Sequence, residues 1–173
     1  MKLLSPLHKK HSSGSRAQAI VEFAIVLPIL LMILVGIFEF ARMVFIYSAV
    51  TNASRNAVRY AAAVGLDDTG LTRFNYCEGI KKVASNSAFL VRTSDFNIQI
   101  DYDHGPDGSG PFAECNLWNA AQVDSDVSVT SGDRVHVTVS ATYRPMVRLI
   151  PLPTKTFTSS SYRTIFGVVS VGE

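Results

Sequence analysis

The chain has few of the residues on which common catalytic and metal sites depend. Among its 173 residues there are two cysteines, four histidines and one tryptophan. It contains no Gly-rich phosphate loop, no paired Cys/His spacing typical of zinc and no serine-nucleophile motif. These absences give no support to a nucleotide-binding enzyme, a zinc domain or a serine hydrolase. We therefore expect no enzymatic activity, no cofactor and no metal.

Acidic residues are missing from the first 17 positions, and charged residues of either sign are missing from 23–38. The first segment instead carries four positive charges, at Lys2, Lys9, Lys10 and Arg16, against a formal net charge of +2 for the whole chain. The remainder is therefore slightly acidic, and we expect no nucleic-acid partner. By the positive-inside rule, the basic end stays in the cytoplasm and the residues beyond the apolar run are translocated.

The apolar run is long enough to cross a membrane. Between Ala19 and Val50 the only charged residues are Glu22, Glu39 and Arg42. Apolar residues occupy every face of a helix over this segment, which predicts lipid surroundings. At about 1.5 Å per residue, the segment covers a hydrocarbon core of roughly 30 Å. We predict one bilayer span, over about residues 20–45, with membrane lipid as its partner.

The helical pattern continues beyond the predicted span. One ridge carries small side chains at every fourth position, on which another helix can pack closely: Ala49, Ala53, Ala57 and Ala61. No proline or glycine interrupts residues 39–64, and Gly65 with the DDTG turn at 67–70 ends the pattern. We predict a single long helix over residues 18–64, transmembrane first and amphipathic after it.

Two ordinary membrane signals compete for this N-terminus. A cleavable secretory signal needs a shorter apolar region followed by a small-x-small site. An uncleaved signal anchor accounts for the charge and the hydrophobicity, but not for Glu22, because a carboxylate in lipid costs up to roughly 2.5–3.5 kcal/mol at mid-bilayer and less near the surface. Near the far boundary, Glu39 and Arg42 are three residues apart, and we expect a local surface ion pair there.

Several blocks of this segment match a known pattern. Residues 16–23 read RAQAIVEF, followed by LP at 27–28 and GIFEFAR at 36–42, and residues 52–62 read NASRNAVRYAA. Together these blocks resemble the TadE-like minor pilins, or pseudopilins, of tight-adherence (Flp-type) pili. The resemblance covers residues 16–64 specifically.

The resemblance implies processing and a role for one carboxylate. In such proteins a prepilin peptidase cuts on the cytoplasmic side of the apolar helix, and a glutamate stands at the fifth mature position. Matching Glu22 to that position places the cut between Ala17 and Gln18, so that residues 1–17 form a cytoplasmic leader peptide. The family usually has glycine where this chain has Ala17. The resemblance also implies that Glu22, followed by Phe23, serves assembly by pairing with the N-terminal amine of a neighbouring subunit.

The function implied is structural. The chain would be needed for assembly or priming of a tight-adherence pilus and so for surface adhesion, with other pilin or pseudopilin subunits and the inner-membrane assembly platform as partners. It would cross the bacterial inner membrane once, with the C-terminal domain in the periplasm, and enter the extracellular pilus in some states. The alternative is an unprocessed single-pass protein that displays a periplasmic binding domain. A membrane-anchored hydrolase is a third class, supported only by His104 and the two cysteines.

Residues 65–173 have the composition of a small translocated domain. Alternating polar and apolar residues predict strands at 96–102 and 135–143, and a third strand is expected over 155–166. A short helix is expected over 79–89. The predicted fold class is α+β, pilin-like, with the long N-terminal helix packed on three or four antiparallel strands.

Cys77 and Cys115 both fall on the translocated side of the span. An even number of cysteines in an oxidising compartment favours a disulfide, and two free thiols are the alternative. Sequence alone does not give the distance between them.

The stretch DYDHGPDGSG at 101–110 holds the one constellation that resembles a ligand site, with Asp101, Asp103, His104 and Asp107. Its Asp-x-Asp spacing can wrap calcium, but an EF-hand needs oxygen ligands where this chain has Gly105 and Phe112. A solvated turn is therefore favoured at 101–107. His136 falls on the polar phase of a predicted strand and is expected to be exposed.

Overall fold

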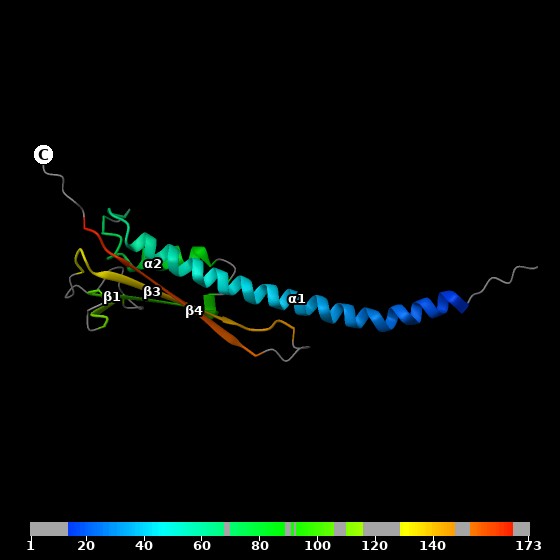
Figure 1. Cartoon of the computed structure of the whole chain (residues 1–173). Coiled ribbons are helices and arrows are strands. Elements are labelled where there is room, and N and C mark those ends of the chain that lie inside the picture. Colours follow the sequence, from blue (N-terminus) through cyan, green and yellow to red (C-terminus); the bar gives the residue numbers. More distant parts are fainter. Residues whose placement is uncertain are drawn as a thin grey trace, which may run out of the picture. The chain divides into compact units, whose positions relative to one another are not determined.

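The computed structural model describes residues 14–67, 70–88, 91, 93–105, 110–115, 129–147 and 153–167. It forms two compact units, Met1–Phe40 and Ala41–Glu173. The elements, shown in Figure 1, follow one another as α1 (Gly14–Ala61), α2 (Cys77–Ser87), a 3₁₀ turn (Thr93–Asp95), β1 (Phe96–Asp103), β2 (Ala113–Glu114), β3 (Arg134–Tyr143) and β4 (Lys155–Thr164).

Helix α1 is 48 residues long and includes Pro28 without interruption. It begins four residues before the predicted start and ends three residues before the predicted end. The Ala62 amide still donates to the Val58 carbonyl at 3.0 Å, but the Ala63 amide donates to Tyr60 at 3.2 Å, so the last turn tightens. Gly65 follows with a φ of 116°, which side-chain-bearing residues rarely adopt. The helix has therefore already ended when the chain reaches Gly65, which turns the chain away from the helical conformation.

The four strands form one antiparallel sheet in the order β2-β1-β3-β4. Burial alternates strictly along β3, where every second residue from Val135 to Tyr143 is buried. The three longer strands and α2 lie within a few residues of the predicted positions. Strand β2 was not predicted, because two residues are too few to show alternation. The observed α+β fold, with the long helix on a small antiparallel sheet, confirms the predicted fold class.

The core lies between the buried face of the sheet and the second half of α1, with α2 alongside α1 in Figure 1. Helix α1 contributes buried side chains at helical spacing: Ile46, Ala49, Val50, Ala53, Ala57, Val58 and Ala61. Strand β3 contributes three buried valines, and α2 contributes Ile80 and Ala84. Small side chains on α1 allow the helix backbone to approach the sheet, which is the local reason for this packing.

The contact between α1 and the edge strand β4 is polar. The Ser54 hydroxyl is fully buried, donates to the Thr51 carbonyl at 3.1 Å and lies 3.0 Å from the hydroxyls of both Ser159 and Ser161. Each of these serines can donate to the Ser54 oxygen, so the buried hydroxyls are satisfied. The serine-rich sequence of β4 therefore has a structural use on its inner face.

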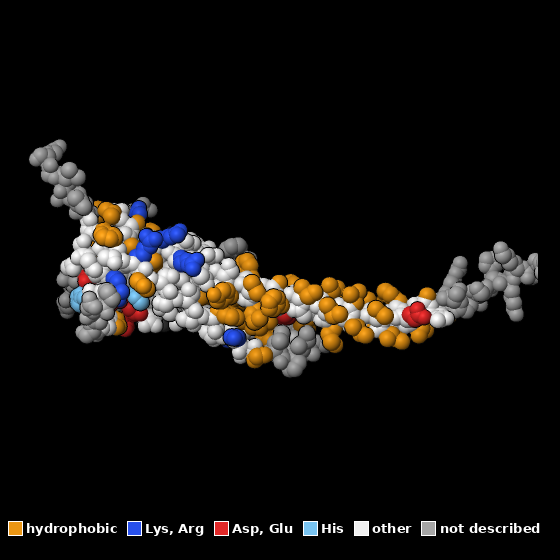
Figure 2. Space-filling model, in the orientation of Figure 1, with side chains coloured by type: hydrophobic (Ala, Val, Ile, Leu, Met, Phe, Trp, Pro, Cys, Tyr) orange, Lys and Arg blue, Asp and Glu red, His pale blue; other side chains and the backbone are white. Residues whose placement is uncertain are grey.

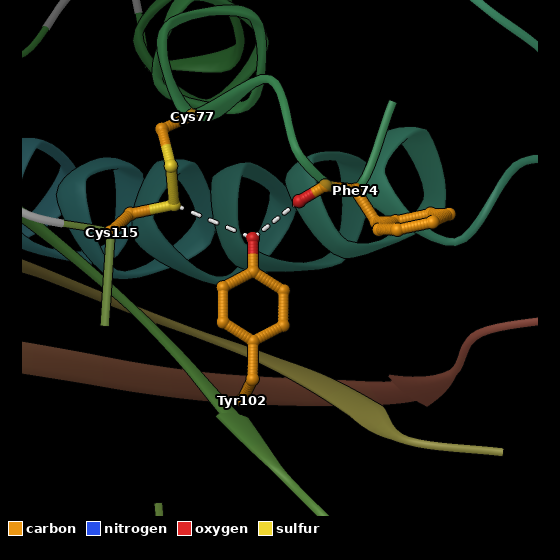
Figure 3. The surroundings of a disulfide bond; sticks show 4 residues. All are labelled: Phe74, Cys77, Tyr102 and Cys115. Carbon is orange, nitrogen blue, oxygen red and sulfur yellow. Dashed lines mark hydrogen bonds between the residues drawn. A yellow bond between two sulfur atoms is a disulfide. The ribbon is translucent and has the colours of Figure 1, made fainter. Parts of the chain in front are cut away.

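A disulfide joins the start of α2 to the chain just after β2 (Figure 3). Cys77 and Cys115 are bonded across 38 residues. The Tyr102 hydroxyl donates to the Phe74 carbonyl and lies 3.4 Å from the Cys115 sulfur. Burial, helped by the nearby charge of Asp101, raises the pKa of the Tyr102 phenol. The expected disulfide is present, and the alternative of two free thiols is wrong for this structure.

Candidate functional site in the N-terminal helix

The residues predicted for processing and assembly lie in the first turns of α1. Because α1 begins at Gly14, the Ala17–Gln18 peptide bond is inside the helix and not before it. The Gln18 side-chain amide donates to a Glu22 carboxylate oxygen at 3.0 Å. Phe23 is 62% exposed. The structure thus places Gln18 and Glu22 on one helix face, one turn apart.

Beyond Glu22, α1 exposes large hydrophobic side chains at most positions, and Figure 2 shows them along the face of the helix that is in view. Those exposed between the first glutamate and Phe40 are Phe23, Ile25, Val26, Ile29, Leu30, Leu31, Met32, Ile33, Leu34, Ile37, Phe38 and Phe40. A helix that is apolar all round and has no protein cover is unstable in water. The segment is long and apolar enough to cross a membrane. This indicates a membrane-anchored, single-pass protein.

Glu39 and Arg42, which were expected to form a surface ion pair near the far boundary, lie in other surroundings. Glu39 is 1% exposed, so its expected surface position is wrong. The Arg42 guanidinium donates to the Arg144 carbonyl at 2.6 Å and lies 5.1 Å from the centroid of the Tyr143 ring. Arg42 therefore binds the chain at the end of β3, about a hundred residues away in the sequence. No local sequence pattern predicts such a contact.

Residues 17–59 match the family model of TadE-like proteins. This segment is TadE-like. The match includes Ala17, Gln18, Glu22 and Phe23, and it confirms the family inferred from the sequence blocks. The match suggests a protein that is associated with Tad pili. No curated protein and no solved structure matches the chain.

The alanine ridge of the TadE-like segment faces inward. Ala49, Ala53, Ala57 and Ala61 are all buried in the core. Helix α2 lies close to α1, since the Asn56 amide donates to the Ser87 hydroxyl at 3.0 Å. Packing of another helix on this ridge stays a prediction.

Within the acidic stretch, Asp103 is held by a backbone amide and by basic side chains. Asp103 accepts hydrogen bonds from the Gly105 amide at 2.8 Å and from Arg134 Nε at 2.7 Å, and His136 Nε2 lies 3.5 Å away. Partial burial alone would raise the pKa of Asp103, but these hydrogen bonds and charges outweigh it, so the pKa lies below its ordinary value. Asp107 lies outside the described residues. Among the residues that are described, no group of three or more acidic, histidine or cysteine side chains is arranged to hold a metal.

Asp133 forms a second anchored carboxylate beside the first. It accepts hydrogen bonds from the Thr130 amide at 2.7 Å and hydroxyl at 3.0 Å, and His104 Nδ1 lies 2.8 Å away. Burial opposes ionisation of this carboxyl, but the hydrogen bonds from Thr130 and His104 lower its pKa overall. His104 also stacks on Phe112 at 4.0 Å. Both cysteines are in the disulfide, so neither is a free thiol that could act with His104 as in the hydrolase alternative.

Sequence reasoning missed the cluster around Tyr162. His136 stacks on the Tyr162 ring at 5.1 Å, and the Arg134 guanidinium lies 5.1 Å from the same ring. His136 is therefore half-buried and not exposed as expected. The polar phase of the strand placed Arg134 and His136 on one face, but only the register of β3 with β4 brings Tyr162 to them.

The depressed pKa values of Asp103 and Asp133 predict acid sensitivity. A carboxyl whose pKa is lower in the folded chain stabilises the fold above its unfolded pKa of about 3.9, and this contribution is lost as the pH falls through the folded value. We expect the free energy of unfolding, measured with urea on the full chain in detergent, to fall as the pH drops below about 4.

The substitution Asp103→Asn should remove part of the pH dependence of the free energy of unfolding. It should lower the stability at pH 7 by about 1–3 kcal/mol, because Arg134 loses its carboxylate. Asp101→Asn, on the same strand, is the matched control and should change stability by less than about 0.5 kcal/mol. Equal pH dependence in Asp103→Asn and the unchanged chain would contradict this assignment.

Proposed function

We propose that this chain is a minor pilin or pseudopilin that is processed by a prepilin peptidase and takes part in assembly or priming of a tight-adherence pilus. The observation that carries the proposal is the TadE-like match over residues 17–59, which contains the predicted cleavage bond and Glu22. The exposed apolar surface that follows supports it, because such a surface needs lipid or other apolar helices around it.

The proposed topology follows from charge. The basic leader stays in the cytoplasm and the sheet domain lies in the periplasm, with α1 crossing the inner membrane. The disulfide supports this placement, since disulfides persist in oxidising compartments. The proposed partners are the prepilin peptidase, other pilin or pseudopilin subunits and the inner-membrane assembly platform. Surface adhesion is the proposed result of the pilus that they build.

The proposed mechanism assigns a use to Glu22. Cleavage at Ala17–Gln18 creates a new amine on Gln18, one helical turn from the Glu22 carboxylate of the same chain. The Gln18 side chain already occupies one carboxylate oxygen. A carboxylate can accept further hydrogen bonds, so the amine of a neighbouring subunit can still pair with it. In lipid this pairing removes an uncompensated charge and so favours assembly.

Replacing Ala17 tests processing. The variant Ala17→Leu should keep its leader, because a bulky side chain replaces a small one beside the scissile bond. Mass spectrometry of the protein isolated from membranes should then find Met1 in Ala17→Leu and Gln18 in the unchanged chain. Ala17→Gly is the matched control and should be cut at least as well as the unchanged chain. Recovery of only leader-bearing protein from cells with a working peptidase would favour the alternative, an unprocessed protein that displays a binding domain.

A further inference from the structure

The end of the sheet domain that lies beside the predicted membrane boundary has its own contacts to α1. Arg42, near the end of the predicted span, donates to the Arg144 carbonyl at 2.6 Å and lies over the Tyr143 ring. Tyr143 is the last residue of β3, so this hydrogen bond holds the chain that leaves β3 against α1. Because Arg42 is the last charged residue of the apolar run and lies near the end of the predicted span, the end of β3 lies near the same level.

The start of β4 lies at that end too. Lys155 pairs with Tyr143 in the sheet register, and Phe157 contacts the Tyr47 ring edge-on with centroids 6.0 Å apart. Tyr47 follows Arg42 by little more than one helical turn. The two strand ends therefore meet the same short stretch of α1, whereas the opposite end of β4, at Thr164, is about 30 Å away along the strand.

The side chains exposed at this end have the chemistry of a membrane surface. Met146 is 62% exposed and Tyr47 is 57% exposed. Two cations accompany them: the Arg144 side chain is 67% exposed, and Lys155 is exposed. Long apolar side chains and tyrosine enter the lipid boundary, while lysine and arginine reach the headgroups.

We propose that this end of the domain, formed by Tyr47, Arg144, Met146 and Lys155, docks on anionic phospholipid headgroups of the leaflet from which α1 emerges. We assign lipid as the binding partner because these residues are held on α1 just beyond its membrane-spanning part. The helix therefore brings them to the lipid boundary whatever its other partners are. Asp95 forms an ion pair with Arg144 at 3.1 Å, but a guanidinium has five donors, so a phosphate can still bind. The contact gives the domain a second attachment and a fixed orientation on the membrane. It does not depend on the proposed pilus function.

Tryptophan quenching by brominated lipid tests the contact. The full chain, with Trp118 replaced by phenylalanine, would carry either Met146→Trp or, as the control at the far end of β4, Tyr162→Trp. In nanodiscs of brominated phosphatidylglycerol, we expect strong quenching at position 146 and none at 162. Lys155→Glu should reduce the quenching at 146 in phosphatidylglycerol and leave it unchanged in brominated phosphatidylcholine, since each cation near an anionic surface changes binding about fivefold.

Hydrogen exchange on the unchanged chain provides a test without substitution. Amides of residues 143–147 should exchange several-fold more slowly in phosphatidylglycerol nanodiscs than in phosphatidylcholine nanodiscs. Absence of quenching at 146 in both lipids, with equal exchange rates, would overturn the proposal. Equal quenching in both lipids, unaffected by Lys155→Glu, would overturn the anionic specificity. If the indole introduced by Met146→Trp is protected from acrylamide but is not quenched by lipid, the surface belongs to a protein partner, such as a second copy, and the proposal is also overturned.

Discussion

Protein that lacks the disulfide should unfold about 10–30 °C below the bonded protein. The bonded cysteines are 38 residues apart in the sequence. A cross-link over this distance lowers the entropy of the unfolded chain and should stabilise the fold by about 4 kcal/mol. Both cysteines are also buried, and the Cys115 sulfur lies 3.4 Å from the Tyr102 hydroxyl. Strand β2 has two residues, so the covalent link from Cys115 to α2 supplies an attachment that the short ladder does not.

The comparison should use Cys77→Ser/Cys115→Ser, with the melting of the full chain in detergent followed by near-UV circular dichroism. Tyr102→Phe is the matched control at the same site: it keeps the disulfide and removes one hydroxyl, and should cost about 1–3 kcal/mol because the Phe74 carbonyl loses its donor. Thiol labelling of the denatured chain should require a reductant. A double variant that melts within about 3 °C of the unchanged chain would contradict a stabilising role.

The parts of the fold that the sequence predicted are those determined by local pattern. The apolar run requires a helix in lipid, and strict alternation requires a half-buried strand, so α1, β1 and β3 were predicted to within a few residues. Strand β4 was predicted from its Thr, Ser and aromatic content, although its small hydroxyl side chains form a polar contact with Ser54 that composition does not reveal.

The parts that were missed depend on contacts between distant residues. The burial of Glu39 and the Arg42–Arg144 hydrogen bond have no local signature, since Glu39 and Arg42 look like any helical charge pair three residues apart. The acidic stretch at 101–110 resembles a cation loop, and only the sheet register brings Arg134 to Asp103. In the candidate site, family blocks pointed to Glu22, whereas the helical state of the Ala17–Gln18 bond was visible only in the structure.

The substitution Glu22→Gln should nearly abolish pilus assembly while leaving the protein folded and inserted. Glu22 is exposed on α1 and lies in the compact unit Met1–Phe40, outside the unit that contains the sheet core. Removing its charge lowers the cost of placing this turn near lipid, so insertion should not suffer. What is lost is the attraction to a neighbour's amine, which is strong only where water is excluded.

Three measurements separate assembly from folding for Glu22→Gln: the mature N-terminus, protection of the sheet domain from protease, and the amount of the chain in sheared pili. The first two should match the unchanged chain, and the third should fall severely. Glu114→Gln makes the same chemical change at an exposed site in β2 and should leave all three unchanged. Gln18→Ala removes the hydrogen bond to Glu22 within the chain but keeps the backbone amine, so it should retain assembly. If Gln18→Ala reduces the amount in pili as severely as Glu22→Gln does, the carboxylate acts within its own chain and the pairing between subunits is contradicted. If Glu22→Gln assembles normally, Glu22 is only a carboxylate at the lipid boundary.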